Sequence, residues 1–168
     1  MTEQREQRQT RRIDPANCSV GRALAEVGER WSLLIVREAL DGVTRFAEFR
    51  ARLGIASNLL STRLDRLVAA GVMNRVAYQE PGDRQRFEYR LTEKGADLRP
   101  TVIALLEWGD KYLADEQGPS VVVRHGTAED HDCDEPVTLV LTCAAGHTGL
   151  PPDSVYRSPG PGARFLPS

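Results

Sequence analysis

The chain has 168 residues, a mass of 18.6 kDa and 40% hydrophobic residues, which suits one domain with a modest core plus appended segments. No run approaches the ~18 apolar residues of a membrane span, and the charged first 17 residues do not form a secretory signal. Three widely separated cysteines argue against a disulfide framework and favour a reducing cytoplasm.

The net charge of -2 conceals an uneven distribution along the chain. From residue 44 to residue 90, nine arginines stand against five acidic residues, a balance of +4. From residue 115 to the end, three arginines stand against eight acidic residues, a balance of -5. A basic centre with an acidic appendage is typical of a DNA-facing module that carries an additional segment.

Residues 1–17 are expected to form a flexible arm. The arm carries four arginines, which either stay solvated or bind DNA phosphates. They are Arg5, Arg8, Arg11 and Arg12. A first helix is expected from Cys18 to Gly28, with Ser19 as its N-cap and an apolar face of Val20, Leu24 and Val27.

Two further helices supply much of the expected core. The second begins at Trp31 and closes at Asp41-Gly42, with core candidates Trp31, Leu34, Ile35 and Leu40. Between it and the third helix, Thr44 and Arg45 leave room for no more than a short strand. The third helix spans residues 46–53, with inward-pointing Phe46, Phe49 and Leu53.

The most informative stretch is GIASNLLSTRLDRLVAAG, residues 54–71. Ser57 is the expected N-cap and Gly71 the stop, and one face is apolar: Leu59, Leu60, Leu64, Leu67 and Val68. The opposite face carries short polar side chains: Asn58, Ser61, Thr62 and Asp65. Because only a three-residue turn separates it from the preceding helix, the pair is predicted to be a helix-turn-helix.

A β-hairpin is expected directly after this helix. In RQRFEYRL, Phe87, Tyr89 and Leu91 alternate with charged residues, as in a half-buried strand, and VMNRVAYQE supplies the partner strand. The tip carries Arg84, Gln85 and Arg86, so the hairpin is predicted to be the wing of a winged helix-turn-helix.

A long helix follows, TEKGADLRPTVIALLEWGDKYL, with Thr92 as its cap and Pro100 as a site of bending. Its apolar residues, among them Leu105, Leu106 and Trp108, exceed what a small core can cover. A homodimer interface is therefore expected, with core packing as the alternative. Two recognition helices about one DNA turn, ~34 Å, apart would read a palindrome.

The remaining residues differ in character. Gln117-Gly118-Pro119-Ser120 is a linker, VVVR and VTLVLT are expected to be short strands, and the rest is rich in loops. We therefore expect an α+β chain, mainly α with a small β-hairpin wing. Its parts are an arm at 1–17, a winged helix-turn-helix DNA-binding and dimerisation domain at 18–114, and an acidic, β-rich extension at 115–168.

An ordered set of motifs in this chain resembles the HxlR-type winged-helix transcriptional regulators, a bacterial family related to the MarR group. The matching stretches are CSVGRAL from Cys18, RWSLLIVREAL from Arg30, RFAEFR from Arg45, LSTRL from Leu60, FEYRLTEKG from Phe87 and the pair Trp108-Gly109. The resemblance implies a homodimer, held mainly by the first and last helices, that binds operator DNA. The chain departs from the pattern at the wing, where Pro81-Gly82-Asp83 replaces the proline pair often found in the family.

The resemblance also places the base-reading surface on the polar face of the helix at 54–71, which we call its front. The residues expected there are Ser57, Asn58, Ser61, Thr62 and Arg63. Asparagine can pair with adenine and arginine with guanine, whereas serine and threonine serve bases or phosphates. Phosphate contacts are expected from arginines around this surface, together with Gln85 at the wing tip: Arg45, Arg50, Arg52, Arg66, Arg84 and Arg86. For Arg52 and Arg66 we consider a role as solvated surface charges, without DNA contact, equally compatible with the sequence.

Cys18 occupies the position that some relatives use to sense oxidants or electrophiles. A helix N-terminus favours a thiolate, and Arg22 one turn further could add to this. The alternative is a small buried hydrophobic side chain.

The extension holds a second candidate site, His131, Cys133, Cys143 and His147, spaced H-x-C-x9-C-x3-H. Zn²⁺ accepts two cysteines and two histidines in a tetrahedral site. Family tails that resemble zinc ribbons carry C-x-x-C-G, which this chain lacks, so a decayed ribbon without metal is the favoured alternative and no cofactor is otherwise expected.

Together these features predict a cytoplasmic, homodimeric transcriptional regulator that binds double-stranded DNA, with repression favoured over activation and an oxidant or small ligand as effector. The alternative is a winged helix used for protein–protein interaction without DNA binding. No phosphate loop, nucleophile elbow or close pair of catalytic polar residues indicates an enzyme.

Overall fold

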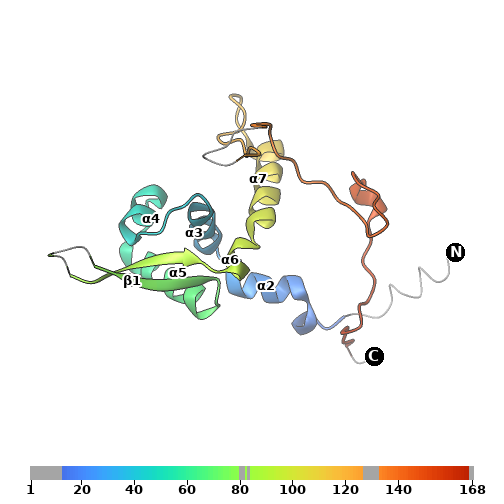
Figure 1. Ribbon diagram of the computed structural model, residues 1–168. Helices are drawn as coiled ribbons and strands as arrows, with labels where there is room; N and C mark the ends of the chain where they lie inside the picture. The colour runs from blue at the N-terminus through green and yellow to red at the C-terminus, as the bar shows by residue number, and fades with distance from the viewer. Residues whose placement is uncertain (1–12, 80–81, 83, 127–132, 167–168) are drawn as a thin grey trace.

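A computed structural model of the chain describes residues 13–79, 82, 84–126 and 133–166. Helices α2–α5 and a two-stranded sheet form the winged helix-turn-helix, and α7 carries the chain away from it (Figure 1). The elements are η1 (Pro15–Asn17), α2 (Ser19–Val27), α3 (Arg30–Leu40), α4 (Phe46–Leu53), α5 (Ser57–Ala69), β1 (Met73–Tyr78), β2 (Arg86–Leu91), α6 (Glu93–Ala96), α7 (Arg99–Leu113) and η2 (Pro152–Ser154).

The turn between α4 and α5 depends on Gly54. Its φ of +61° is left-handed, which favours glycine, and its N–H donates to the Arg50 carbonyl at 3.0 Å. This confirms the predicted helix-turn-helix. The predicted caps were wrong by one residue, because Ala56 and Cys18 are the N-caps of α5 and α2, whereas Ser57 and Ser19 are already helical.

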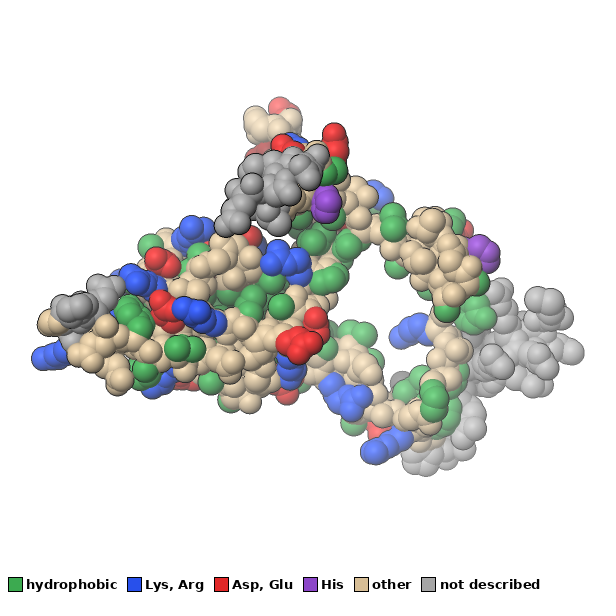
Figure 2. Space-filling model, in the orientation of Figure 1, with side chains coloured by type: hydrophobic (Ala, Val, Ile, Leu, Met, Phe, Trp, Pro, Cys, Tyr) green, Lys and Arg blue, Asp and Glu red, His purple; other side chains and the backbone are tan. Residues whose placement is uncertain are grey.

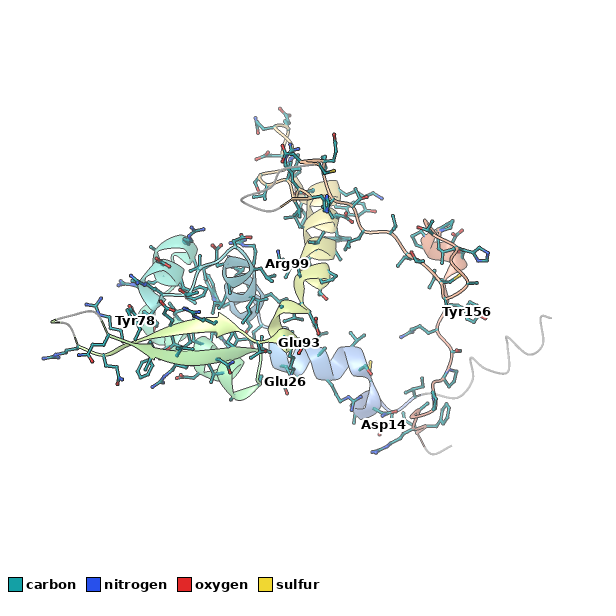
Figure 3. All side chains as sticks on the ribbon, in the orientation of Figure 1. Asp14, Glu26, Tyr78, Glu93, Arg99 and Tyr156 are labelled. Carbon is teal, nitrogen blue, oxygen red and sulfur yellow. The ribbon has the colours of Figure 1, made fainter. Side chains whose placement is uncertain are left out.

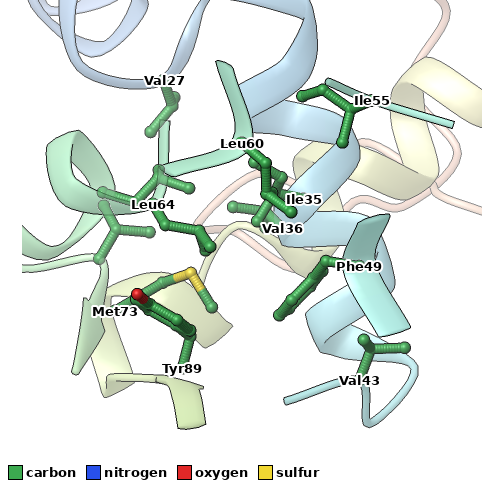
Figure 4. Close-up of a cluster of buried hydrophobic side chains, with 12 residues drawn as sticks. Val27, Ile35, Val36, Val43, Phe49, Ile55, Leu60, Leu64, Met73 and Tyr89 are labelled. Atoms are coloured by element: carbon green, nitrogen blue, oxygen red, sulfur yellow. The ribbon is translucent and has the colours of Figure 1, made fainter. Parts of the chain in front are cut away.

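The core lies between α3, α4, α5 and the sheet (Figure 4). Ile35, Phe49, Leu60, Leu64 and Leu67 are completely buried. The other apolar residues expected on these faces, Leu59 and Val68 of α5 among them, pack partly buried around this cluster, with the exception of Leu34. The helical periodicity therefore predicted the inward faces of α4 and α5 correctly, whereas in α3 Val36 is buried and Leu33 packs against the core in place of Leu34.

The wing is an antiparallel pair in which Met73 lies opposite Leu91 and Tyr78 opposite Arg86. The short segment before α4 joins this sheet: the Tyr89 N–H donates to the Thr44 carbonyl at 2.8 Å, and Arg45 forms an isolated bridge with Glu88. These bonds hold the start of α4 against the wing, so helix-turn-helix and wing form one packed unit.

The long helix expected after the wing is divided into α6 and α7. The Thr92 hydroxyl accepts from the Gly95 N–H at 3.1 Å, which confirms it as an N-cap, but the first helix ends after one turn. Pro100 has no N–H and stands in the first turn of α7, a position that proline favours. The expected bend is therefore a break, from which α7 begins in a new direction.

Two helices present apolar side chains to solvent. On α7, Leu105, Trp108 and Tyr112 are at least half exposed, and on α2, Val20 and Leu24 are similarly exposed. Only Val27 of the expected apolar face of α2 is buried. The winged helix of this chain therefore leaves both faces uncovered.

The extension runs from the end of α7 back towards the start of the chain (Figure 1). Its expected strands appear only as isolated bridges, Arg124 with Pro136 and Thr142 with Thr148, among the residues that the structure describes. The Leu139 N–H donates to the Glu107 carboxylate of α7 at 2.8 Å, and the Arg164 N–H donates to the Asn17 side chain at 2.8 Å. Hydrogen bonds thus tie the extension to both ends of the domain.

Candidate nucleic-acid interface

The front of α5 is a continuous exposed polar surface. Ser57, Asn58, Ser61 and Thr62 are all exposed, on the side opposite the buried Leu60, Leu64 and Leu67. The Thr62 hydroxyl donates to the Asn58 carbonyl at 2.9 Å, and the Asn58 side-chain oxygen accepts from the Leu59 N–H at 2.9 Å. The Asn58 side-chain NH2 group, and the second lone pair of its oxygen, remain available for pairing with adenine.

Arg63 does not belong to this front. Its side chain is only 14% exposed, and its Nη2 lies 3.1 Å from Oε2 of Glu29, the N-cap of α3. Residue 63 stands three positions after Leu60 and four before Leu67, so helical periodicity places it with the buried stripe. The structure therefore removes Arg63 from the base-reading set, and the spacing of these leucines was the signal that could have shown this.

The other predicted arginines separate into two groups. Arg45 is the N-cap of α4 and Arg50 lies inside that helix, and Arg84, Gln85 and Arg86 are exposed on the wing. Figure 2 shows several Lys and Arg side chains at the end of the molecule formed by α4 and the wing. Arg45 sits 5.0 Å from the centre of the Tyr78 ring and 3.7 Å from the Glu88 carboxylate, so the wing positions it. These side chains flank α5 as phosphate-binding residues would.

Two arginines have other surroundings. Arg52 pairs with Oε2 of the buried Glu38 at 3.4 Å, and Arg37 pairs with the other oxygen of the same carboxylate. Arg66 is exposed but lines a pocket against α2 together with Arg63. Both arginines therefore have structural partners or neighbours away from the front.

Cys18 lies half-buried at the N-terminus of α2. The backbone N–H groups of Gly21 and Val20, in the first turn of α2, lower the pKa of its thiol, and the positive charges of Arg157 and Arg22 act in the same direction, against the smaller opposing effect of desolvation. The sequence indicated Arg22 but not Arg157, which the extension brings back from far along the chain. These groups favour the thiolate form of Cys18 relative to an isolated cysteine.

The candidate zinc ligands come together only in part. Cys143 Sγ lies 3.3 Å from His147 Nδ1, Cys133 is exposed, and His131 lies outside the described residues. No three His, Cys, Asp or Glu side chains gather to hold a metal within residues 13–79, 82, 84–126 and 133–166. The described residues thus supply two of the four ligands that a structural zinc needs, and the four-ligand site stays a prediction.

No helix within the described part of the chain has the length and apolar character to cross a bilayer.

Comparison with known proteins agrees with this geometry. Residues 26–117 match the family described as HxlR-like helix-turn-helix. An uncharacterised HTH-type transcriptional regulator of Mycobacterium bovis is 45% identical over 144 residues, covering 86% of this chain and 87% of the relative. Because residues 1–114 cannot supply 144 matched positions, the similarity includes part of the extension.

Solved structures show the same similarity. A candidate transcription factor, PA1607, superposes with a TM-score of 0.73 at 38% identity, over 85% of this chain and 95% of that one. The redox regulator HypR in its reduced form superposes with a TM-score of 0.51 at 33% identity, over 56% of this chain and 92% of HypR. With a helix-turn-helix, a wing and a family match over more than half of its length, the chain belongs to the HxlR-like helix-turn-helix family.

Proposed function

We propose that this protein is a homodimeric transcriptional regulator that binds a palindromic operator in double-stranded DNA. The observation that carries the proposal is the front of α5, where four exposed short polar residues follow a tight turn and stand between exposed arginines of α4 and the wing. Short polar side chains let a helix approach base edges closely, and the arginines bind the flanking phosphates.

The base-reading residues in this proposal are Ser57, Asn58, Ser61 and Thr62. Arg45, Arg50, Arg84, Gln85 and Arg86 bind backbone, which sets affinity and register without reading sequence. Asp65 is exposed one turn further along α5, where its charge would repel phosphate. It therefore marks the end of the DNA-facing part of the helix.

The exposed apolar faces of α2 and α7 support the homodimer. Leu105, Trp108 and Tyr112 on α7 and Val20 and Leu24 on α2 have no cover from the winged helix of the same chain. A two-fold symmetric pair would bury these faces and hold two α5 helices at a fixed separation. That separation selects a palindrome with one half-site for each α5.

Oxidation of Cys18 is the proposed input. The thiol has a lowered pKa, lies on a helix of the proposed interface, and occurs in a chain similar to a redox regulator. Modification there would change how α2 packs and hence the spacing of the two α5 helices. We further propose repression in the cytoplasm, since a dimer that occupies a promoter blocks it without another contact surface.

The test is selection of bound fragments from genomic DNA, followed by affinity measurements on the selected site between 50 and 200 mM salt. Over this range added salt lowers the affinity of a protein with roughly six to ten phosphate contacts by about 10³–10⁵-fold. A palindromic site with a steep salt dependence supports the proposal. A protein that binds no DNA at low salt would contradict it and favour a protein-interaction module. Against that alternative, the front of α5 has no exposed apolar residue at positions 58, 61, 62 or 65.

A further inference from the structure

The Arg45 side chain lies across the wing, although Arg45 belongs to the segment before α4. Its backbone forms an isolated bridge with Glu88 of β2, on the edge of β2 that does not face β1. Its guanidinium carbon nevertheless sits 5.0 Å from the centre of the Tyr78 ring on β1. Figure 3 shows Tyr78 on the wing beside α4. The side chain therefore crosses β2 and joins the start of α4 to both strands of the wing.

Glu88 is an acidic residue in a region where DNA is proposed to bind. One of its carboxylate oxygens, Oε1, lies 3.7 Å from Nε of Arg45. The other, Oε2, accepts hydrogen bonds from Nε and Nη2 of Arg90 at 3.0 and 2.7 Å. The Glu88 side chain is only 14% exposed, whereas that of Arg45 is 46% exposed. The carboxylate is thus mostly withdrawn from solvent, and about half of the Arg45 side chain remains accessible.

A hollow of about 520 Å³ lies between the start of α4 and the wing, next to these contacts. Its charged lining residues are Arg45, Arg86 and Glu48, which give it a formal charge of +1. Tyr78 and Phe87 add aromatic rings to the lining. A phosphodiester of DNA carries one negative charge, so a single backbone phosphate matches the charge of the hollow.

We infer that this hollow binds one phosphodiester of the operator backbone, held by Arg45 and Arg86. Tyr78 and Glu88 act as positioning residues for Arg45. The inference rests on the proposed function for its partner, double-stranded DNA. An arginine that rotates without restriction loses side-chain entropy when it binds a phosphate. Because the ring and the carboxylate restrict Arg45 before DNA arrives, less of this entropy is lost on binding.

The test is a set of double-mutant cycles on operator affinity, measured by fluorescence anisotropy with the full-length protein and its selected operator. Arg45→Ala should weaken binding. This loss should be about two- to tenfold smaller when Tyr78→Leu or Glu88→Gln is already present, which is the usual effect of immobilising one side chain. Tyr78→Phe keeps the ring and should leave the full loss. A merely structural role of Tyr78 or Glu88 would lower affinity equally with and without Arg45.

Arg50→Ala is the matched control. Arg50 is an exposed arginine in the last turn of the same helix, so the loss that it causes should be the same in all of these backgrounds. Ethylation of operator phosphates locates the contact. Ethylation of one phosphate in each half-site should block binding of the unmodified protein, and the Arg45→Ala protein should no longer respond to ethylation at that phosphate.

An Arg45→Ala loss of equal size in every background would overturn the positioning role, and so would a Tyr78→Phe protein that behaves like Tyr78→Leu. An unchanged ethylation pattern in the Arg45→Ala protein would overturn the phosphodiester assignment. Glu88→Gln keeps the cycle available if Tyr78→Leu does not fold. A protein that binds no operator would remove both proposals, whereas operator binding without coupling to Arg45 removes only the positioning role and keeps the regulator.

Discussion

Arg63 of α5 and Glu29 at the start of α3 form an ion pair, with Nη2 3.1 Å from Oε2, on the side of the recognition helix that faces the protein. The buried leucines of α5 fix which way the helix is rotated, and Arg63 lies on the same stripe as these leucines. An unpaired buried donor costs about 1–3 kcal/mol, so this contact matters for the orientation of the helix. The proposed base-reading surface lies on the opposite, exposed stripe, which includes Asn58.

Gly54→Ala should destabilise the protein by about 1–2 kcal/mol, the usual cost of a left-handed conformation for a residue with a Cβ. The φ of Gly54 is +61°, and an added Cβ would meet nothing within 4 Å, so backbone strain alone is responsible. Urea unfolding followed by circular dichroism measures the change.

Gly109→Ala is the matched control for this prediction. Gly109 lies inside α7 and likewise has nothing within 4 Å of an added Cβ, but its φ is not left-handed. Because alanine favours the helix more than glycine does, Gly109→Ala should raise the free energy of unfolding by about 0.5–1 kcal/mol. Equal effects of the two substitutions would show that the turn does not depend on Gly54.

Asn58→Ala should relax sequence preference at one base pair of each half-site and cost about 1–3 kcal/mol on the preferred operator. The amide is exposed at the start of α5, where helix N-termini approach base edges. Competition between the operator and single-base variants gives the measurement. Unchanged discrimination at every position would remove Asn58 from the reading surface.

Arg84→Ala should weaken binding to all sequences alike and reduce the salt slope by about 1, as expected for loss of one phosphate contact. Arg84 is exposed on the wing, and Arg22 on α2 provides a control at a distance from the front of α5. Affinities measured over a salt series distinguish the two variants. A loss restricted to one sequence would instead make Arg84 a base-reading residue.

Cys18 should remain reactive at lower pH than an ordinary cysteine. Because its pKa is lowered, a larger fraction is thiolate at any given pH, and alkylation by iodoacetamide should therefore persist as the pH falls. Arg157→Gln removes a positive charge near the sulfur, so it should raise the pKa and move the alkylation profile to higher pH. Mass spectrometry of the Cys18 peptide follows the reaction.

Cys18→Ser tests whether oxidation of Cys18 controls operator binding. The variant should bind operator in the absence of oxidant and keep binding after peroxide treatment, whereas the unmodified protein releases it. Release of DNA by oxidised Cys18→Ser would move the sensor to another residue, with the exposed Cys133 as the first to test.

Trp108→Glu should weaken the dimer by roughly 2 kcal/mol or more, because it places a charge where a large apolar surface is expected to be buried. Trp108 is 56% exposed and contacts Tyr112 in a tilted arrangement, with ring centres 5.4 Å apart. Light scattering should detect monomers, and operator affinity should fall with them. Lys111→Glu changes charge on the same helix at a position that is already polar, and should leave the dimer intact.

The sequence by itself determined the winged helix-turn-helix and most of its core. The apolar spacing of α3, α4 and α5 has a period of 3.6 residues and that of β2 a period of two, and both are local properties that folding preserves. The left-handed turn at Gly54 is equally local. The polar front of α5 follows from the same periodicity, which is why Asn58, Ser61 and Thr62 could be identified without coordinates.

Only the tertiary structure decided which charged side chains from different elements lie next to one another. Arg63 lies next to Glu29, Arg52 next to Glu38, and the charge of Arg157 acts on Cys18. The members of each pair are distant in sequence, so these pairings follow only from the packing of the helices and the extension. The break before α7 was not predicted either, because the sequence was equally compatible with one long helix that bends at Pro100. Periodicity determines which face of a helix is buried, but the partners of a charge depend on the folded neighbourhood.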